Sequence, residues 1–345
     1  MTAVVSTPHG PGAVLAKVAS PVGRLVSHKW FQPVAVVVVL LVALFVLPAA
    51  FGSYWVANFT QTALTATLAA SAGLLYGRVG LVSLGQVAPY GIGTWVTIRL
   101  AFATSLPFPF LLLIAGVIAA VLGVLIGLPA LRVSGLYLAL VSLMLVAAVE
   151  ILLNELKFAN GGGGFRGVST TNDPQPMRVP SFAQTSYSYY RFCVIGAFVL
   201  FMLAAFVLSR KPGRAWASIR QSEAAAISAG IDVTRYKIYA LALASFMAGV
   251  AGGLFAGSVP KSMDVGSFSR QAAIFLIAAV IMGGIRSLWG GLLAGVFATV
   301  LLKFLTQNVV GHGFWTRFSL SLFGFGLMMN LVQSSKAADK KGVAA

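Results

Sequence analysis

Residues 108–128 read FPFLLLIAGVIAAVLGVLIGL, without a single charged side chain. A helix of about 20 apolar residues crosses the roughly 30 Å hydrocarbon core of a bilayer, so this stretch predicts a membrane-spanning helix. Comparable apolar runs recur on both sides of it. The ten candidate spans cover 33–51, 56–77, 80–103, 108–128, 134–156, 189–209, 236–258, 270–287, 288–310 and 315–333. We therefore expect an all-α fold, a polytopic transmembrane helical bundle of about ten spans.

The composition also indicates a lipid environment. Of the 345 residues, 59% are hydrophobic and 9% are charged, whereas a soluble domain carries about 25% charged residues. A net charge of +17 would suggest nucleic acid in a soluble protein. Here the basic residues lie between apolar runs, where they orient helices and meet anionic headgroups, so no nucleic-acid partner is expected. One cysteine and three histidines give no reason to expect a metal site.

The positions of lysine and arginine predict the topology. With a cytoplasmic N-terminus, most of the 24 basic residues fall on the inner side of the ten spans, as the positive-inside rule requires. Both termini are then cytoplasmic. We expect a cytoplasmic tail at 1–32, a transmembrane domain at 33–333 and a second cytoplasmic tail at 334–345. Its two long loops are an outer loop at 157–188 and a cytoplasmic loop at 210–235. We interpret 33–51 as an uncleaved span; the alternative is a signal peptide.

The third candidate span is unusually rich in residues that disfavour a helix. Within 80–103 these residues are Gly80, Gly85, Pro89, Gly91 and Gly93. Backbone polar groups at membrane depth must be buried in protein or line a cavity. We therefore expect one broken or partly re-entrant glycine-rich segment that lines a solute pathway, with Ser83 and Gln86 offering hydrogen bonds. The alternative is that the glycines serve only close helix packing and that Gln86 bonds to a neighbouring helix.

The segment 209–237, SRKPGRAWASIRQSEAAAISAGIDVTRYK, predicts a short cytoplasmic helix between two spans. Pro212 and Gly213 are expected to break the preceding span, and 214–229 has good helix propensity. Gly230 supplies a helix stop because it tolerates positive φ. The apolar side chains of this helix need a surface to cover them. The helix therefore either rests on lipid headgroups or docks in a groove on a cytoplasmic partner.

Five blocks of sequence resemble a known family. Glu223-Ala224-Ala225, followed five residues later by Gly230, resembles the coupling loop of ABC-transporter inner-membrane permeases. The blocks around it resemble the branched-chain amino-acid (high-affinity leucine/isoleucine/valine) importer family. They are GLVSLGQVAPYGIG at 80–93, GLPALRVSGLYLALVSL at 127–143, GGGGFRGV at 161–168 and MGGIRSLWGGLLAGV at 282–296. The resemblance runs from about residue 60 to 300.

The sequence departs from the family pattern at four places. Gln86 stands where the family often has histidine, and four glycines replace the threonine-glycine-glycine of the outer loop. Arg286 occupies a position that is usually small, and Gln221-Ser222-Glu223 stands where two acidic residues are common. These departures concern the substrate rather than the fold.

The resemblance implies a membrane-spanning permease subunit of an ATP-driven importer, translocating branched-chain or other hydrophobic amino acids across the cytoplasmic membrane. Implied partners are cytoplasmic ABC ATPase subunits, a second homologous permease or another copy of the chain, an extracytoplasmic solute-binding protein and membrane lipid. The chain lacks a P-loop motif, so we expect no enzymatic activity and no bound cofactor, with ATP and Mg²⁺ used by the partner ATPase. The alternatives are a related permease for urea, short amides or sugars, or an ion-coupled secondary transporter.

The same resemblance and the local chemistry assign candidate site residues. For ATPase coupling they are Arg214, Arg220, Glu223, Ala224, Ala225, Gly230 and Lys237. For the substrate pathway they are Ser83, Gly85, Gln86, Gly91 and Tyr137, and for a structural turn Gly283, Gly284 and Trp289.

Several of these assignments keep a plainer alternative. Arg214 and Arg220 contact either the ATPase or lipid phosphate, and Tyr137 is better explained as an anchor at the membrane interface than as a ligand. Glu223 either pairs with a basic residue of the ATPase or caps its own helix. Glu150, within an apolar run, is expected to reach water or an arginine. Glycines at small-residue spacing, at 123 and 127, 249, 252 and 253, and 291 and 295, are expected to allow close helix packing.

Overall fold

The computed structural model describes residues 42–46, 48, 52–131, 135–156, 183–258, 268–284 and 288–301. The chain divides into two compact units, Met1–Ala50 and Phe51–Ala345. In the first unit the described element is the short π-helix η1 (Val42–Val46). The predicted tails at 1–32 and 334–345, the span at 315–333 and most of the outer loop at 157–188 lie outside the described residues.

Every regular element among the described residues is a helix. The second unit contains, in order, α5 (Ser53–Gly73), η2 (Leu74–Val79), α6 (Val87–Ala103), α7 (Phe108–Ala130), α8 (Leu136–Leu156), α9 (Ser186–Ser209), α10 (Lys211–Gln221), α11 (Glu223–Ser228), α12 (Val233–Ala256), α13 (Arg270–Gly283), α14 (Leu288–Val296) and η5 (Phe297–Leu301). Four of them, α7, α8, α9 and α12, are long and apolar enough to cross a membrane. The predicted helical class is confirmed in this part of the chain, and the number of about ten spans stays a prediction.

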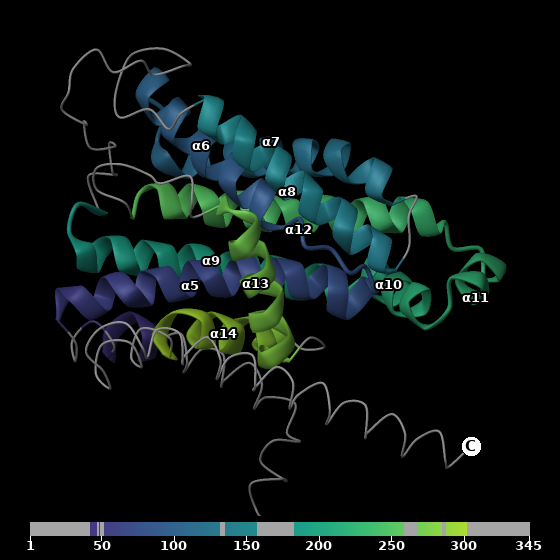
Figure 1. The fold of residues 1–345 in the computed structure, drawn as a ribbon. Coiled ribbons are helices and arrows are strands. Elements are labelled where there is room, and N and C mark those ends of the chain that lie inside the picture. The colour runs from purple at the N-terminus through teal and green to yellow at the C-terminus, as the bar shows by residue number, and fades with distance from the viewer. Residues whose placement is uncertain are drawn as a thin grey trace, which may run out of the picture. The chain divides into compact units, whose positions relative to one another are not determined.

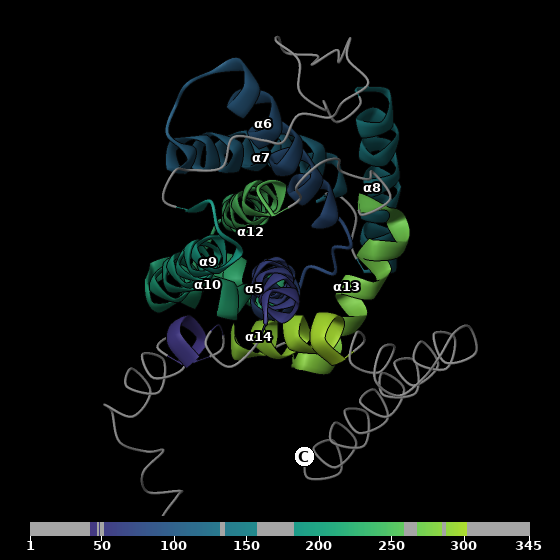
Figure 2. The ribbon, with the colours of Figure 1, turned by 90° about the vertical axis from the view of Figure 1, so that its left-hand side faces the viewer.

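Helices α5 and α12 form the centre of the second unit. Helix α12 packs against α7, α6 and α5, and α5 packs in addition against α14 and α9. Figure 2, which looks along these helices, shows α5 and α12 surrounded by the others. By contrast α7 turns a stripe of large apolar side chains outward, among them Phe110, Leu113, Val117 and Val121, each more than half exposed. Such an outward apolar stripe suits contact with lipid rather than water.

Glycines bring the backbones of α6 and α12 into direct contact. A Cβ added to Gly93 would lie 2.1 Å from the carbonyl oxygen of Gly249, and one added to Gly252 would lie 2.0 Å from that of Tyr90. The approach lets Thr94 Oγ1 donate a hydrogen bond of 2.9 Å to the Gly252 carbonyl. The packing role expected from glycine spacing is confirmed here. Added Cβ atoms would likewise collide with neighbouring helices at Gly123, Gly127, Gly249, Gly253, Gly291 and Gly295.

The glycine-rich third span is broken only at its start. Residues 80–86 are not helical, and Gly80, at φ +86°, ends η2 in the left-handed region that glycine adopts readily. From Val87 onward α6 is continuous, so the expectation that Pro89, Gly91 and Gly93 interrupt the helix is wrong. Pro89 is the third residue of α6, in the first turn, where a missing N–H costs no intrahelical hydrogen bond.

The segment between α9 and α12 forms two helices rather than the single one expected. Ser222 is extended, with φ −160° and ψ 120°, and its Oγ accepts the N–H of Ala225 at 3.3 Å. A serine that caps the next helix in this way separates α10 from α11. The break after α9 falls at Arg210, and Pro212 lies in the first turn of α10, which proline tolerates.

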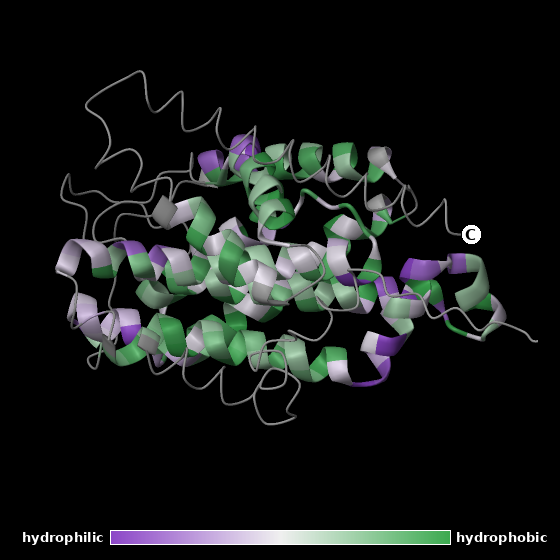
Figure 3. Cartoon of the chain, turned by 90° about the horizontal axis from the view of Figure 1, so that it is seen from below, coloured by the Kyte–Doolittle hydropathy of each residue, from purple (hydrophilic) through white to green (hydrophobic). Residues whose placement is uncertain are grey.

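Helix α11 ends where the sequence predicts. Gly230 has φ +77°, its N–H bonds to the Ile227 carbonyl at 2.9 Å, and the N–H of Ile231 bonds to the Ala226 carbonyl at 3.0 Å. This pair of bonds is the Schellman motif, which places glycine in the left-handed region after a helix. Figure 1 shows α10 and α11 together at one end of the bundle, and Figure 3 shows hydrophilic residues at that end and at the opposite one.

Candidate functional site

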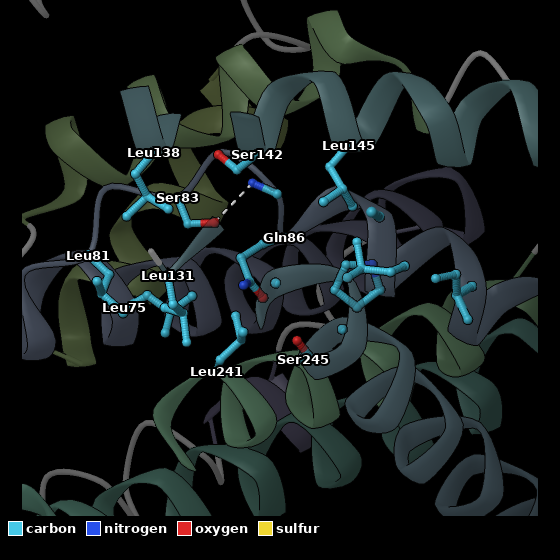
Figure 4. Close-up of a pocket in the computed structure, with 17 residues that line it drawn as sticks. Leu75, Leu81, Ser83, Gln86, Leu131, Leu138, Ser142, Leu145, Leu241 and Ser245 are labelled. Carbon is cyan, nitrogen blue, oxygen red and sulfur yellow. Dashed lines mark hydrogen bonds between the residues drawn. The ribbon is translucent and has the colours of Figure 1, made fainter. Parts of the chain in front are cut away.

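A small pocket lies at the end of the bundle that carries α10 and α11. Its wall is formed by η2, the segment 80–86 with the start of α6, the C-terminal half of α7, and the N-terminal halves of α8 and α12 (Figure 4). Its cavity volume is about 40 Å³, enough for a few water molecules. Most of the lining is apolar, with six leucines: Leu75, Leu81, Leu131, Leu138, Leu145 and Leu241. The side-chain polar groups of the lining come from Ser83, Gln86, Ser142 and Ser245.

Two of these serines hold the broken backbone of segment 80–86. Ser142 Oγ, on α8, accepts the N–H of Leu84 at 2.9 Å and donates to the carbonyl of Ala139 at 2.9 Å. Ser83 Oγ accepts the N–H of Gly85 at 3.3 Å (Figure 4). Backbone N–H groups freed by a helix break at membrane depth need partners of this kind. The hydroxyls of Ser83 and Ser142 therefore serve the local fold.

Gln86 is almost completely buried between the pocket and α5. Its side chain is 2% exposed, and its Oε1 accepts a long hydrogen bond of 3.4 Å from Ser71 Oγ. Gln86 lines the pocket and also bonds to a neighbouring helix, and its role in a solute pathway stays a prediction.

Ser245, on α12, differs from the other polar groups of the pocket. It is 1% exposed, and its Oγ has no hydrogen-bond partner among the described residues. The wall opposite is Gly123 of α7, where an added Cβ would lie 2.3 Å from Ser245 Oγ. The glycine leaves room for this hydroxyl at the pocket wall.

The structure gathers three of the five predicted pathway residues. Ser83, Gly85 and Gln86 line the pocket, and Gly91 and Tyr137 do not. A Cβ on Gly91 would meet Leu153 at 3.0 Å, so this glycine serves helix packing on another face of α6. Tyr137 is 71% exposed, because the helical turn that brings the next residue, Leu138, to the pocket points Tyr137 outward. Ser142 and Ser245 were not predicted, since a single serine in an apolar helix gives no pattern to follow.

The predicted coupling residues lie on α10, on α11, in the turn that follows α11 and near the start of α12. Glu223 of α11 forms an ion pair with Lys237 of α12, at 2.7 Å between Oε1 and Nζ. Ala224, Ala225 and Arg214 are exposed. The ion pair gives Glu223 a partner within its own chain. The sequence had predicted either a basic residue of the ATPase as its partner or a cap on its own helix.

Helix α10 is attached to the bundle by its apolar face. Trp216 is completely buried and donates from Nε1 to the carbonyl of Tyr236 at 2.9 Å, and Ile219 is 2% exposed. On α11, by contrast, Ile227 is 63% exposed. The apolar side chains of α10 are therefore buried against the chain's own bundle, whereas Ile227 of α11 is exposed.

Arg220 connects α10 to the wall of the pocket. Its Nη1 donates to the carbonyl oxygen of Gly77, in the last turn of η2. A cation at a helix C-terminus satisfies a free carbonyl and interacts favourably with the helix dipole. The left-handed Gly80 lies alongside, since a Cβ there would be 3.6 Å from Arg220 Cγ. Segment 80–86 and its pocket thus begin directly at the contact between α10 and η2.

Two further predictions concern the opposite end of α8 and the turn after α13. Glu150 Oε2 lies 3.5 Å from Arg270 Nε, so the expectation that Glu150 reaches water or an arginine is confirmed.

Gly284 ends α13 with φ +100°, and a Cβ on Gly283 would lie 2.2 Å from the Gly290 carbonyl oxygen. The residues between, 285–287, and the side chain of Trp289 lie outside the described part of the chain.

Comparison with known proteins places this arrangement in a family. The family model for the permease component of the branched-chain amino acid transport system matches residues 54–332, which include the pocket, α10 and α11. The chain belongs to this family. Family membership and the apolar helices together make it a membrane protein.

Individual relatives in this permease family carry the same kind of name. The chain is 31% identical to the "High-affinity branched-chain amino acid transport system permease protein LivM" of Salmonella typhimurium over 260 residues, and 32% identical to that of Escherichia coli over 263 residues. Each match covers 70% of this chain and 61% of the relative. A probable LivM of Methanocaldococcus jannaschii is 26% identical over 239 residues, 64% of this chain and 66% of that relative. The chain thus spans about three fifths of the length of the first two relatives. No solved structure matched the chain.

Proposed function

We propose that the chain is the permease subunit of an ATP-driven importer that carries branched-chain or other hydrophobic amino acids across the cytoplasmic membrane. The observation that carries this proposal is the pocket, which combines six leucines with a few neutral polar groups. An apolar lining suits a solute with an aliphatic side chain, and it leaves the many hydroxyls of a sugar or the amide groups of urea without partners. The permease family and the LivM relatives point to the same class of solute.

In this proposal the pocket is part of the pathway near the cytoplasmic side. It is small and mostly apolar, and the solute passes when its wall moves. Segment 80–86 is the part of the wall that moves in this scheme, because it is not helical. Its backbone N–H groups donate to the hydroxyls of Ser83 and Ser142 instead of to helix carbonyls.

Partner ATPases, which would bind ATP and Mg²⁺, provide the force in this scheme. Exposed α11, with Ile227 outward, is the part offered to a groove on the ATPase. Movement then passes through α10, which is fixed to the bundle by Trp216, to Gly77 through Arg220, and so to segment 80–86. A second permease subunit and an extracytoplasmic solute-binding protein complete the importer, with both termini of this chain in the cytoplasm.

The decisive experiment is uptake by the reconstituted importer, with this chain, its ATPases, its second permease and its binding protein in vesicles. We expect ATP-dependent leucine uptake that unlabelled isoleucine and valine compete and that urea and ribose do not. Competition by urea or ribose instead would favour the related permeases. Uptake by the purified chain alone, driven by an ion gradient, would show a secondary transporter.

Gly230 offers a matched pair of variants for the coupling step. Its φ of +77° costs a β-branched residue about 1–3 kcal/mol, whereas asparagine adopts this region readily, and no atom lies within 4 Å of an added Cβ. Gly230→Val should therefore displace α11 and lose most leucine uptake while the ATPases still hydrolyse ATP. Gly230→Asn should keep most of it. Normal uptake by Gly230→Val would contradict the coupling role of α11.

A further inference from the structure

One hydroxyl of the pocket lining, that of Ser245, makes no hydrogen bond to the described part of the chain. Ser83 Oγ and Ser142 Oγ bond to the backbone of segment 80–86 or α8, and Gln86 Oε1 bonds to Ser71 Oγ. Ser245 is 1% exposed, more deeply buried than Ser83, and lines the same pocket, and its Oγ has no hydrogen-bond partner among the described residues. A buried hydroxyl left without a partner is costly, by about 1–3 kcal/mol, and calls for an explanation.

The surroundings of Ser245 show that its position is built rather than accidental. Gly123 on α7 leaves the space into which the hydroxyl fits, since a Cβ at Gly123 would come within 2.3 Å of Ser245 Oγ and 2.6 Å of its Cβ. Leu241 lies one turn before Ser245 on the same face of α12 and lines the pocket as well. In Figure 4 the Ser245 oxygen points toward the side of the pocket where Gln86 lies.

We propose that Ser245 is a solute-binding residue of the pathway, whose hydroxyl hydrogen-bonds the polar end of the solute while the leucines of the pocket contact its apolar side chain. This inference rests on the proposed transport function. None of the 17 lining residues carries a charge, so the polar end is bound through neutral groups alone. Serine suits either half of an amino-acid zwitterion, because a hydroxyl both donates to a carboxylate and accepts from an ammonium.

The test is the variant Ser245→Ala in the complete reconstituted importer, with leucine as the probe and saturating binding protein. Losing a hydrogen bond to a charged group of the solute should slow leucine transport by about tenfold or more. The amount of leucine carried per ATP hydrolysed should fall with it. The melting temperature should stay at or slightly above that of the wild type, because the change removes an unpartnered buried hydroxyl.

Thr60→Val is the matched control. Thr60 is also buried, but its Oγ1 bonds only within α5, to the Val56 carbonyl at 2.9 Å, and it does not line the pocket. Removing this hydroxyl should leave leucine transport per ATP unchanged.

Three results separate the possibilities. Unchanged transport by Ser245→Ala, with an active wild type, would overturn the inference alone. A fall in melting temperature that accounts for the lost transport would also overturn it, because Ser245 would then be structural, for example through a bound water. If the wild type itself carried no leucine, the proposed function would fail before Ser245 was tested.

Discussion

Replacing Gly93 by alanine tests the closest contact of the bundle. The added Cβ would lie 2.1 Å from the carbonyl oxygen of Gly249, whereas real Cβ contacts essentially never fall under 3.0 Å. Helices α6 and α12 must therefore separate by about 1 Å, because neither backbone can yield in the way that a flexible side chain does.

The cost of this separation has two parts. Overpacking a well-packed core costs about 1–3 kcal/mol. The same movement would lengthen the 2.9 Å hydrogen bond from Thr94 Oγ1 to the Gly252 carbonyl beyond bonding distance, which adds about 0.5–1.5 kcal/mol. We therefore expect a loss of about 1.5–4.5 kcal/mol in the free energy of unfolding from these terms together.

The assay is thermal unfolding of the purified chain in lipid nanodiscs, where a loss of this size lowers the melting temperature by several degrees. Gly52→Ala is the control, because Gly52 precedes α5 with an ordinary φ of −67° and has no atom within 4 Å of an added Cβ. If Gly93→Ala and Gly52→Ala melted together, the direct backbone contact between α6 and α12 would be refuted.

Two further variants test the wall of the pocket. Ser142→Ala should lower the melting temperature, because it leaves the buried N–H of Leu84 without its 2.9 Å partner at a cost of about 1–3 kcal/mol; an unchanged melting curve would argue against this contact. Arg220→Ala should reduce leucine carried per ATP hydrolysed by severalfold, because it disconnects α10 from Gly77, and Arg220→Lys should retain part of it. A wild-type ratio in Arg220→Ala would remove Arg220 from the coupling route.

Much of the helical framework could be predicted from the sequence. Runs of apolar residues locate α7, α8, α9 and α12, since lipid requires such runs at roughly 20 residues. Glycine spacing predicted the close packing at Gly249 and Gly252, because only small residues let two helix backbones come into contact. The break at Gly80 followed from a local conformational preference, which a single sequence expresses directly.

The segment between α9 and α12 was harder to predict, because helix propensity does not decide tertiary contacts. Residues 214–229 look like one helix, yet Ser222 adopts an extended conformation and caps α11. The pattern also shows that Trp216 and Ile227 need a surface, but not which surface. Trp216 packs against the chain's own bundle, while Ile227 stays exposed.

The pocket was found only in part. Ser83 and Gln86 were identified because they follow a backbone break, a feature that has a physical signature in sequence. Ser142 and Ser245 stand alone in apolar helices, where a serine is tolerated as a small residue whether or not it faces a cavity. The two serines join the site only through the packing of α8 and α12 around segment 80–86, which local pattern cannot supply.

Hydrogen bonds from two neighbouring helices hold the far end of α12. Thr94 and Tyr189 donate there to the carbonyls of Gly252 and Leu254, whereas the polar partners of its near end, Trp216 and Glu223, belong to α10 and α11. At 1.5 Å per residue, Val233 lies about 28 Å from Gly252, and Ser245 lies about 10 Å from it. If α12 pivoted at Gly252, a shift imposed at Val233 would reach Ser245 reduced to about one third, so several ångströms beside α11 would become a small displacement at the pocket.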